Sequence, residues 1–192
     1  MSPRAMHGYT VRMRKYVVLL RGINVGGKNA VSMDSLKECL NELGFTTVKT
    51  YIASGNVIVG SNKSAPTVRD LIEKALPKCF KLDRKFIKVL VLTPEQLKTV
   101  IENKPKGFGE QPNKYHSDVI FLMDIDAAEA MVAFNPHEGV DRVWQGEGVI
   151  YSQRLSARRT ASRLNRIISS PLYASMTIRN WNTTTKMFEL VS

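Results

Sequence analysis

Residues 15–20 read KYVVLL, and residues 21–30, which follow directly, read RGINVGGKNA. The first segment is a compact apolar run that predicts a buried strand, and the second is a polar loop with three glycines. Residues 34–43 show helical spacing of apolar side chains and are followed by Gly44, a residue type that often terminates helices. We therefore expect the core to begin with a strand, a long loop and a helix.

The next segments complete a pattern of six elements. Two strands are predicted at residues 47–54 and 57–59, with Gly55-Asn56 between them as a hairpin signal. A helix at residues 66–76 and a strand at residues 85–92 follow. The order β-α-β-β-α-β is that of a ferredoxin-like unit.

The same order is predicted a second time, after a short connecting helix that begins at Thr93-Pro94. Its elements are strands at 117–123, 141–144, 149–151 and about 175–179, helices at 127–134 and 161–169, and a final helix from about 183 to 190. We therefore expect an α+β fold of tandem ferredoxin-like β-α-β-β-α-β units. Their sheets are mostly antiparallel with helices on one face, and a C-terminal helix follows.

Composition suggests the domain boundaries. Residues 1–12 read as an N-terminal extension without the apolar segment of a secretory signal, and residues 13–103 as the first unit with its connecting helix. Residues 104–113, rich in Pro, Gly and Lys, are the predicted linker, and residues 114–192 hold the second unit and the C-terminal helix. No apolar run approaches the length of a membrane span, so we expect no membrane partner.

The two cysteines indicate a cytoplasmic location. Cys39 and Cys79 each lie in the apolar surroundings of a separate predicted helix. We expect both to be unbridged, reduced thiols, as is usual in the cytoplasm.

Positive charge is concentrated at the two ends of the chain. The sequence has 28 Lys+Arg against 17 Asp+Glu, a formal net charge of +11, and between Glu147 and Glu189 it has no acidic residue. Clustered cations beside polar, glycine- or asparagine-rich segments favour an anionic partner, most simply a phosphate group.

The loop after the first strand is the first candidate anion site. Gly22 to Lys28 satisfies the G-x-x-x-x-G-K spacing, in which backbone N–H groups and a lysine surround phosphate. Asn29 stands where a Walker motif needs Ser or Thr for Mg²⁺, so we expect neither Mg²⁺-dependent binding nor ATP hydrolysis. The alternative is an ordinary strand-to-helix loop whose cations face water.

The candidate ligand-binding residues are Arg21, Asn24, Gly26, Gly27, Lys28, Ser54, Asn56, Arg179 and Asn180.

A series of arginines is the second candidate anion site. Arg154, Arg158, Arg159, Arg163 and Arg166 follow one another without an intervening acid, and helical spacing would put the last three on one face. The alternative is a solvated helix face, but such a face usually mixes both signs of charge.

Known catalytic and cofactor motifs are absent from the sequence. The three histidines lack ligand spacing with one another or with the cysteines, so no metal site and no cofactor are expected, and the catalytic residues are unknown. The strands also lack the exposed aromatic pattern of a sequence-specific RNA-recognition motif.

Four segments carry a family resemblance. Residues 16–29 (YVVLLRGINVGGKN), 51–57 (YIASGNV), 162–164 (SRL) and 176–183 (MTIRNWNT) resemble, in this order, the motifs of DUF1697, a bacterial family of unknown function. The resemblance runs from about residue 13 to 192. It implies a two-part α+β fold of ferredoxin-like units and no assigned activity.

Two functional hypotheses follow. The first is a cytoplasmic anion-binding protein that engages a phosphate-bearing ligand, either nucleic acid or a nucleotide-like small molecule. The second is an enzyme that acts on a small anionic substrate in a cleft between the two units, with Arg21, Asn24, Lys28, Arg179 and Asn180 as binding groups.

Overall fold

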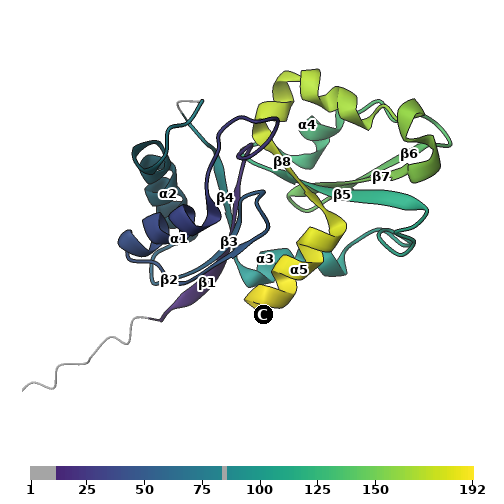
Figure 1. Ribbon diagram of the computed structural model, residues 1–192. Coiled ribbons are helices and arrows are strands. Elements are labelled where there is room, and N and C mark those ends of the chain that lie inside the picture. The colour runs from purple at the N-terminus through teal and green to yellow at the C-terminus, as the bar shows by residue number, and fades with distance from the viewer. Residues whose placement is uncertain (1–11, 84–85) are drawn as a thin grey trace, which may run out of the picture.

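The computed structural model describes residues 12–83 and 86–192. Its strands form two four-stranded sheets. Figure 1 shows helices on the outer faces of the sheets and between them. The first unit contains β1 (Arg14–Leu20), α1 (Met33–Glu42), β2 (Thr46–Tyr51), β3 (Asn56–Ser61), α2 (Ala65–Cys79) and β4 (Val89–Leu92). The connecting helix is α3 (Pro94–Glu102). The second unit contains β5 (Tyr115–Leu122), α4 (Ala127–Met131), β6 (Asp141–Gly146), β7 (Val149–Leu155), the 3₁₀ helices η1 (Ser156–Ala161), η2 (Leu164–Ser169) and η3 (Pro171–Ser175), β8 (Met176–Asn180) and α5 (Trp181–Val191).

The two sheets have the same topology. Their strand orders are β2-β3-β1-β4 and β6-β7-β5-β8, and every pairing is antiparallel. The prediction of two ferredoxin-like units with antiparallel sheets and a C-terminal helix is confirmed. Residues 1–11 of the predicted extension lie outside the described residues.

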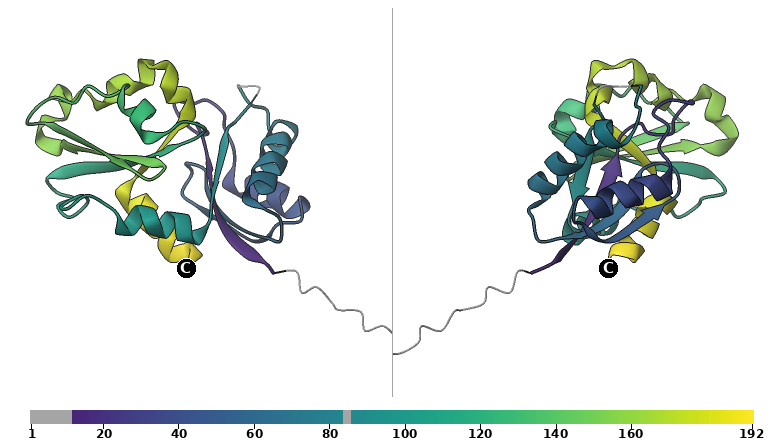
Figure 2. Two further views of the ribbon diagram at one scale, coloured as in Figure 1. Left: turned by 180° about the vertical axis from the view of Figure 1, so that it is seen from behind. Right: turned by 60° about the vertical axis from the view of Figure 1, so that its left-hand side comes forward.

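Both faces of each sheet are buried. On β1, Val18 and Leu20 face the core beneath α1 and α2, while Val17 and Leu19 face a second core between the sheets. That second core also contains Phe121 of β5, and buried side chains of α3 and α5 pack into it. The views in Figure 2 agree that α1 and α2 cover the outer face of the first sheet. Because alternate side chains enter two different cores, the central strands read as continuous apolar runs.

The predicted linker is packed into this shared core. Phe108 is fully buried and makes edge-to-face contacts with the rings of Trp144, Tyr151 and Trp181. Gly109 has a φ of +75°, and a Cβ at this position would collide with the indole ring of Trp181. The glycine therefore reflects close packing of the connection against α5, which composition alone does not show.

The predicted helix at residues 161–169 is wrong. Two short 3₁₀ helices, η1 and η2, occupy this region, and Ser162 between them is extended. The buried carboxylate of Asp141 accepts the backbone N–H of Arg163 (2.8 Å), immediately after that break. The single arginine face expected from helical spacing therefore does not form.

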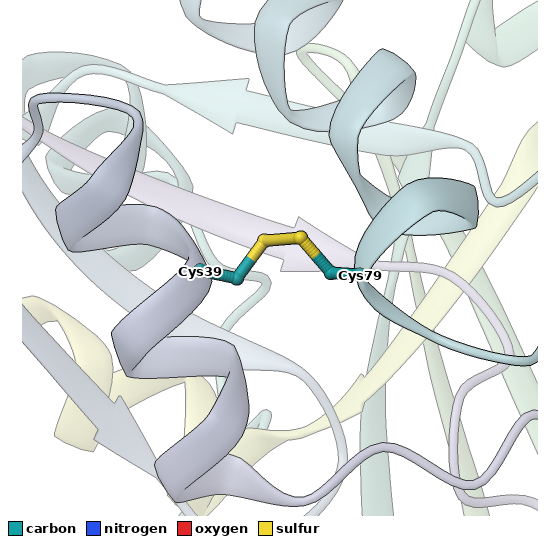
Figure 3. Close-up of a disulfide and its surroundings, with 2 residues drawn as sticks. All are labelled: Cys39 and Cys79. Atoms are coloured by element: carbon teal, nitrogen blue, oxygen red, sulfur yellow. A yellow bond between two sulfur atoms is a disulfide. The ribbon is translucent and has the colours of Figure 1, made fainter.

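The prediction of two free thiols is also wrong, because Cys39 and Cys79 form a disulfide (Figure 3). α1 and α2 lie side by side on one face of the first sheet, with a Cα–Cα distance of 6.5 Å between the two cysteines. Cys39 is buried, as expected, but Cys79, the last residue of α2, is exposed. Spacing along the chain could not show that these two helices meet.

We expect reduction of this disulfide to destabilise the protein. The bond joins residues 40 positions apart, and closing a loop of this size contributes about 2–4 kcal/mol, chiefly by restricting the unfolded chain. Addition of dithiothreitol should lower the Tm by roughly 5–15 °C. A Cys39→Ser, Cys79→Ser variant should match the reduced protein and should not respond to reductant. An equal Tm with and without reductant in the unmodified chain would contradict this account.

Candidate functional site

The glycine-rich loop forms a tight turn at its tip. Val25 and Lys28 form an isolated antiparallel bridge, and the Lys28 N–H donates to the carbonyl oxygen of Val25 (3.1 Å). Gly26 and Gly27 between them have φ values of +59° and +74°, the signature of a type I′ turn, which glycine adopts without strain. Lys28 is consequently exposed at the tip of a small hairpin, together with both glycines.

Two asparagines hold the base of this loop. The side-chain amide of Asn24 donates to the carbonyl oxygens of Val31 (2.8 Å) and Ala53 (2.7 Å), and its oxygen accepts the Val31 N–H (2.8 Å). Asn29 is buried, and its side-chain amide donates to the carbonyl oxygen of Gly22 (2.9 Å). These side chains therefore bind the loop to itself and to the β2–β3 turn.

Arg179, on β8, connects the two units. Its Nε donates to Oδ1 of Asn56 (2.5 Å), and Nη2 donates to the carbonyl oxygens of Leu20 (2.8 Å) and Gly55 (3.4 Å). Nη1 donates within its own strand, to Oγ1 of Thr177 (2.9 Å) and to the carbonyl oxygen of Ile178 (2.8 Å). The guanidinium thus joins β8 of the second unit to the ends of β1 and β3 in the first.

This guanidinium is a buried charge without a carboxylate partner among the described residues. Only 7% of Arg179 is exposed, and burial lowers its pKa to about 10, so it stays charged at neutral pH. Hydrogen bonds to neutral acceptors offset part of the cost of burying the charge. An external anion would have to displace these bonds to reach it.

Asn56 and Ser54 extend the same network. The side-chain amide of Asn56 donates to Oγ of Ser54 (2.9 Å) and to the carbonyl oxygen of Tyr51 (3.1 Å), so its oxygen is oriented toward Arg179. Because Asn56 is fully buried, its amide group needs these partners.

Arg21 makes a second connection between the units. Its Nε donates to the carbonyl oxygen of Met176 (2.9 Å) and its Nη2 to that of Tyr173 (2.9 Å). The guanidinium carbon also lies 5.1 Å from the centroid of the Tyr173 ring. Arg21 therefore holds the start of the loop against η3 and β8.

The structure thus separates the predicted ligand residues into three groups. Arg21, Ser54, Asn56 and Arg179 share the junction between the units, and Asn24 supports it from the loop. Gly26, Gly27 and Lys28 lie exposed at the hairpin tip. Asn180 alone makes up the third group, because it donates to the carbonyl oxygen of Ser117 (3.2 Å) and caps α5.

The arginine series forms an exposed basic surface over the end of the second sheet. Arg158, Arg159 and Arg166 are exposed on η1 and η2, and they make no ion pair with any described residue. The Ser156 N–H donates to the carbonyl oxygen of Lys114 (3.0 Å), which places the start of η1 beside β5. We call Lys114, Arg142, Arg154, Arg158, Arg159, Arg163 and Arg166 the arginine surface.

Asp141 anchors this surface. Its Oδ2 accepts the backbone N–H groups of His137 (2.9 Å) and Arg163 (2.8 Å). Burial acts to raise the pKa of Asp141, but these N–H groups and the Ser162 hydroxyl outweigh it and leave the pKa below its usual range. The carboxylate therefore stays ionised at neutral pH and fixes the backbone that carries the arginines. The charge pattern of the sequence pointed to these arginines, but no feature of the sequence predicted that the Asp141 carboxylate holds the backbone beneath them.

Within residues 12–83 and 86–192 there is no cluster of three or more His, Cys, Asp or Glu residues with the arrangement of a metal site. In the same residues, no helix has the length and apolar character needed to cross a membrane.

Comparisons with known proteins identify relatives but no activity. A family model described as "Protein of unknown function (DUF1697)" matches residues 13–151. The solved structure of the conserved bacterial protein SP0830 from Streptococcus pneumoniae is similar, with 25% sequence identity and a TM-score of 0.74. The match covers 94% of this chain and 100% of that one. No curated protein matches.

We expect Arg179→Ala to destabilise the fold by about 3 kcal/mol or more. The substitution leaves Oδ1 of Asn56 and the carbonyl oxygen of Leu20 without their buried donor, and each unsatisfied group costs about 1–3 kcal/mol. Urea unfolding should show this loss, and Lys49→Ala, on the exposed edge of β2, serves as the control. A stable Arg179→Ala variant that had lost only anion binding would instead identify Arg179 as a ligand residue.

Proposed function

Because the chain belongs to the DUF1697 family, whose description assigns no activity, we propose its function from its own surface: it binds a phosphate-bearing polyanion, most simply nucleic acid. The arginine surface is the observation that carries this proposal. It presents several guanidinium groups on one end of the second unit without acidic partners among the described residues, and phosphate oxygens satisfy such groups.

The charge pattern favours an extended anion over a small one. The members of the arginine surface lie immediately before β5, on β6 and β7, and on or between η1 and η2, so we expect several of these cations to contact successive phosphates of one strand. Two of these cations lie near the ring of Tyr115, with Lys114 Nζ 5.2 Å and the Arg142 guanidinium carbon 5.5 Å from its centroid. A single aromatic ring among several cations favours contacts to phosphates over contacts to the edges of bases. Because phosphate contacts carry no sequence information, we expect binding with little sequence preference.

The enzyme hypothesis has less support. A cavity of about 520 Å³ does lie between the two units, but its charged lining consists of Arg69, Glu73, Lys88 and Asp124. Equal numbers of cations and carboxylates do not favour a small anionic substrate. The five binding groups named for this hypothesis do not line the cavity.

The cytoplasmic location stays a prediction. The Cys39–Cys79 disulfide is the observation against it, since structural disulfides are rare in reducing compartments. Alkylation of thiols in freshly lysed cells, followed by mass spectrometry of the intact protein, would show whether Cys39 and Cys79 are reduced thiols or a disulfide in the cell.

The arginine surface should produce salt-dependent binding to nucleic acid. We expect the combined variant Arg158→Ala, Arg159→Ala, Arg166→Ala to bind a labelled duplex about tenfold or more weakly, because hydrogen bonds to charged groups contribute about 1.5–3 kcal/mol each. The slope of log K against log salt should shrink by roughly 0.9 for each phosphate that the variant no longer neutralises. Fluorescence anisotropy over a salt series measures both quantities.

The matched control is Lys37→Ala, Lys74→Ala, Lys78→Ala, which removes the same charge from exposed positions on α1 and α2. If both triple variants bind the duplex equally weakly, the effect is one of net charge and the proposed site is wrong.

The hairpin tip is a second, smaller candidate anion site. Lys28→Ala should weaken binding of ATP, measured without Mg²⁺, by about 1–3 kcal/mol. The Tm should stay nearly unchanged, because Lys28 is exposed. An unfolded variant, or a folded one with unchanged ATP affinity, would show that this loop has no ligand role.

A further inference from the structure

The first sheet ends in an edge strand with open hydrogen-bonding groups. β4 lies at the end of the order β2-β3-β1-β4. The Arg21 N–H donates to the carbonyl oxygen of Lys88 (3.0 Å), so residues 88, 90 and 92 direct their backbone groups toward β1. Val89 and Val91 therefore direct theirs away from the sheet, and Glu73 accepts the Val89 N–H (2.8 Å). For the outward N–H and C=O of Val91 no partner exists among the described residues.

Two adjoining cavities follow this edge. Besides the cavity of about 520 Å³ between α2, β4 and the end of β5, a second cavity of about 360 Å³ lies between β4, α3 and the β6–β7 turn. Both are lined by Leu90, Val91, Gln96 and Leu122, so they adjoin each other along β4, and we call the two cavities together the groove. The four residues of β4 span about 13 Å in extended conformation, enough for a segment of similar length beside them.

The charge of the groove is opposite to that of the whole protein. Its charged lining comprises two cations and four carboxylates: Arg69, Lys88, Glu73, Glu95, Asp124 and Glu147. Lys88 is also paired with Asp124 (3.7 Å), and Glu95 and Glu147 both line the second cavity. In a chain of net charge +11, this local excess of carboxylates disfavours an anionic occupant and favours a cationic one.

We propose that this groove binds an extended, basic peptide segment of a partner protein, which adds to β4 as a fifth strand. Main-chain hydrogen bonds to Val91 give affinity in this mode, and apolar side chains enter the groove beside Leu90 and Leu122. Basic side chains of the peptide pair with Glu95 and Glu147. The site is separate from the arginine surface, so a partner peptide and a polyanion can be bound together.

The test uses the full chain and a synthetic peptide of alternating lysine and valine, acetylated and amidated at its ends. In ¹H–¹⁵N spectra, the peptide should shift the amide signals of residues 89–92, 96–99 and 147–149. A peptide with glutamate in place of each lysine is the matched control and should not bind. Shifts that map to another surface, or equal binding of the glutamate peptide, would overturn the proposal.

Two variants separate the backbone contribution from the charge contribution. Val91→Pro removes the outward N–H, at an edge position where proline is tolerated, and should weaken peptide binding about fivefold or more. Glu95→Gln with Glu147→Gln should weaken it similarly and reduce its salt dependence. Unchanged affinity in the charge variant would overturn the proposal even if Val91→Pro failed to fold. An oligonucleotide that shifted the same signals would also overturn it.

Discussion

The apolar core between the two sheets is the constraint on which the rest of the structure depends. Each sheet buries one face beneath its own helices and the other in this shared core, together with α3 and α5. Phe108, from the connection between the units, lies at its centre against three aromatic rings. Neither unit could expose its half of this core to water without losing a large part of its hydrophobic stabilisation. The two ferredoxin-like units therefore form one body.

The polar junction at one end of this core explains why residue types that are typical of ligand-binding sites occur in motifs far apart in the sequence. Arg179 and Arg21 direct their guanidinium groups to carbonyl oxygens across the boundary between the units. Asn56 accepts from Arg179 and is itself oriented by Ser54. A buried guanidinium satisfied by neutral acceptors fixes the relative position of the elements that supply them. These motif residues thus serve the assembly of the fold, and the function is proposed at surfaces away from them.

The sequence predicts the strands well because burial of both faces leaves continuous apolar runs, as on β1 and β5. It fails where a contact joins distant segments. Cys39 and Cys79 belong to separate helices, and only the packing of α1 beside α2 brings the two thiols together. Residues 161–169 have helical spacing, but the bond from the Arg163 N–H to Asp141 and the extended Ser162 divide them into 3₁₀ turns. Charge clustering drew attention to the arginines, but it could not distinguish the buried Arg179 from the exposed Arg158 and Arg159.

Calorimetry is the most direct test of the shared core. If the two units form one body, unfolding of the oxidised protein is a single transition, and the van't Hoff enthalpy equals the calorimetric enthalpy. Two separate transitions, or a van't Hoff enthalpy near half the calorimetric value, would show that the units unfold independently. That result would contradict the structural role assigned to Phe108 and to the Arg179 junction.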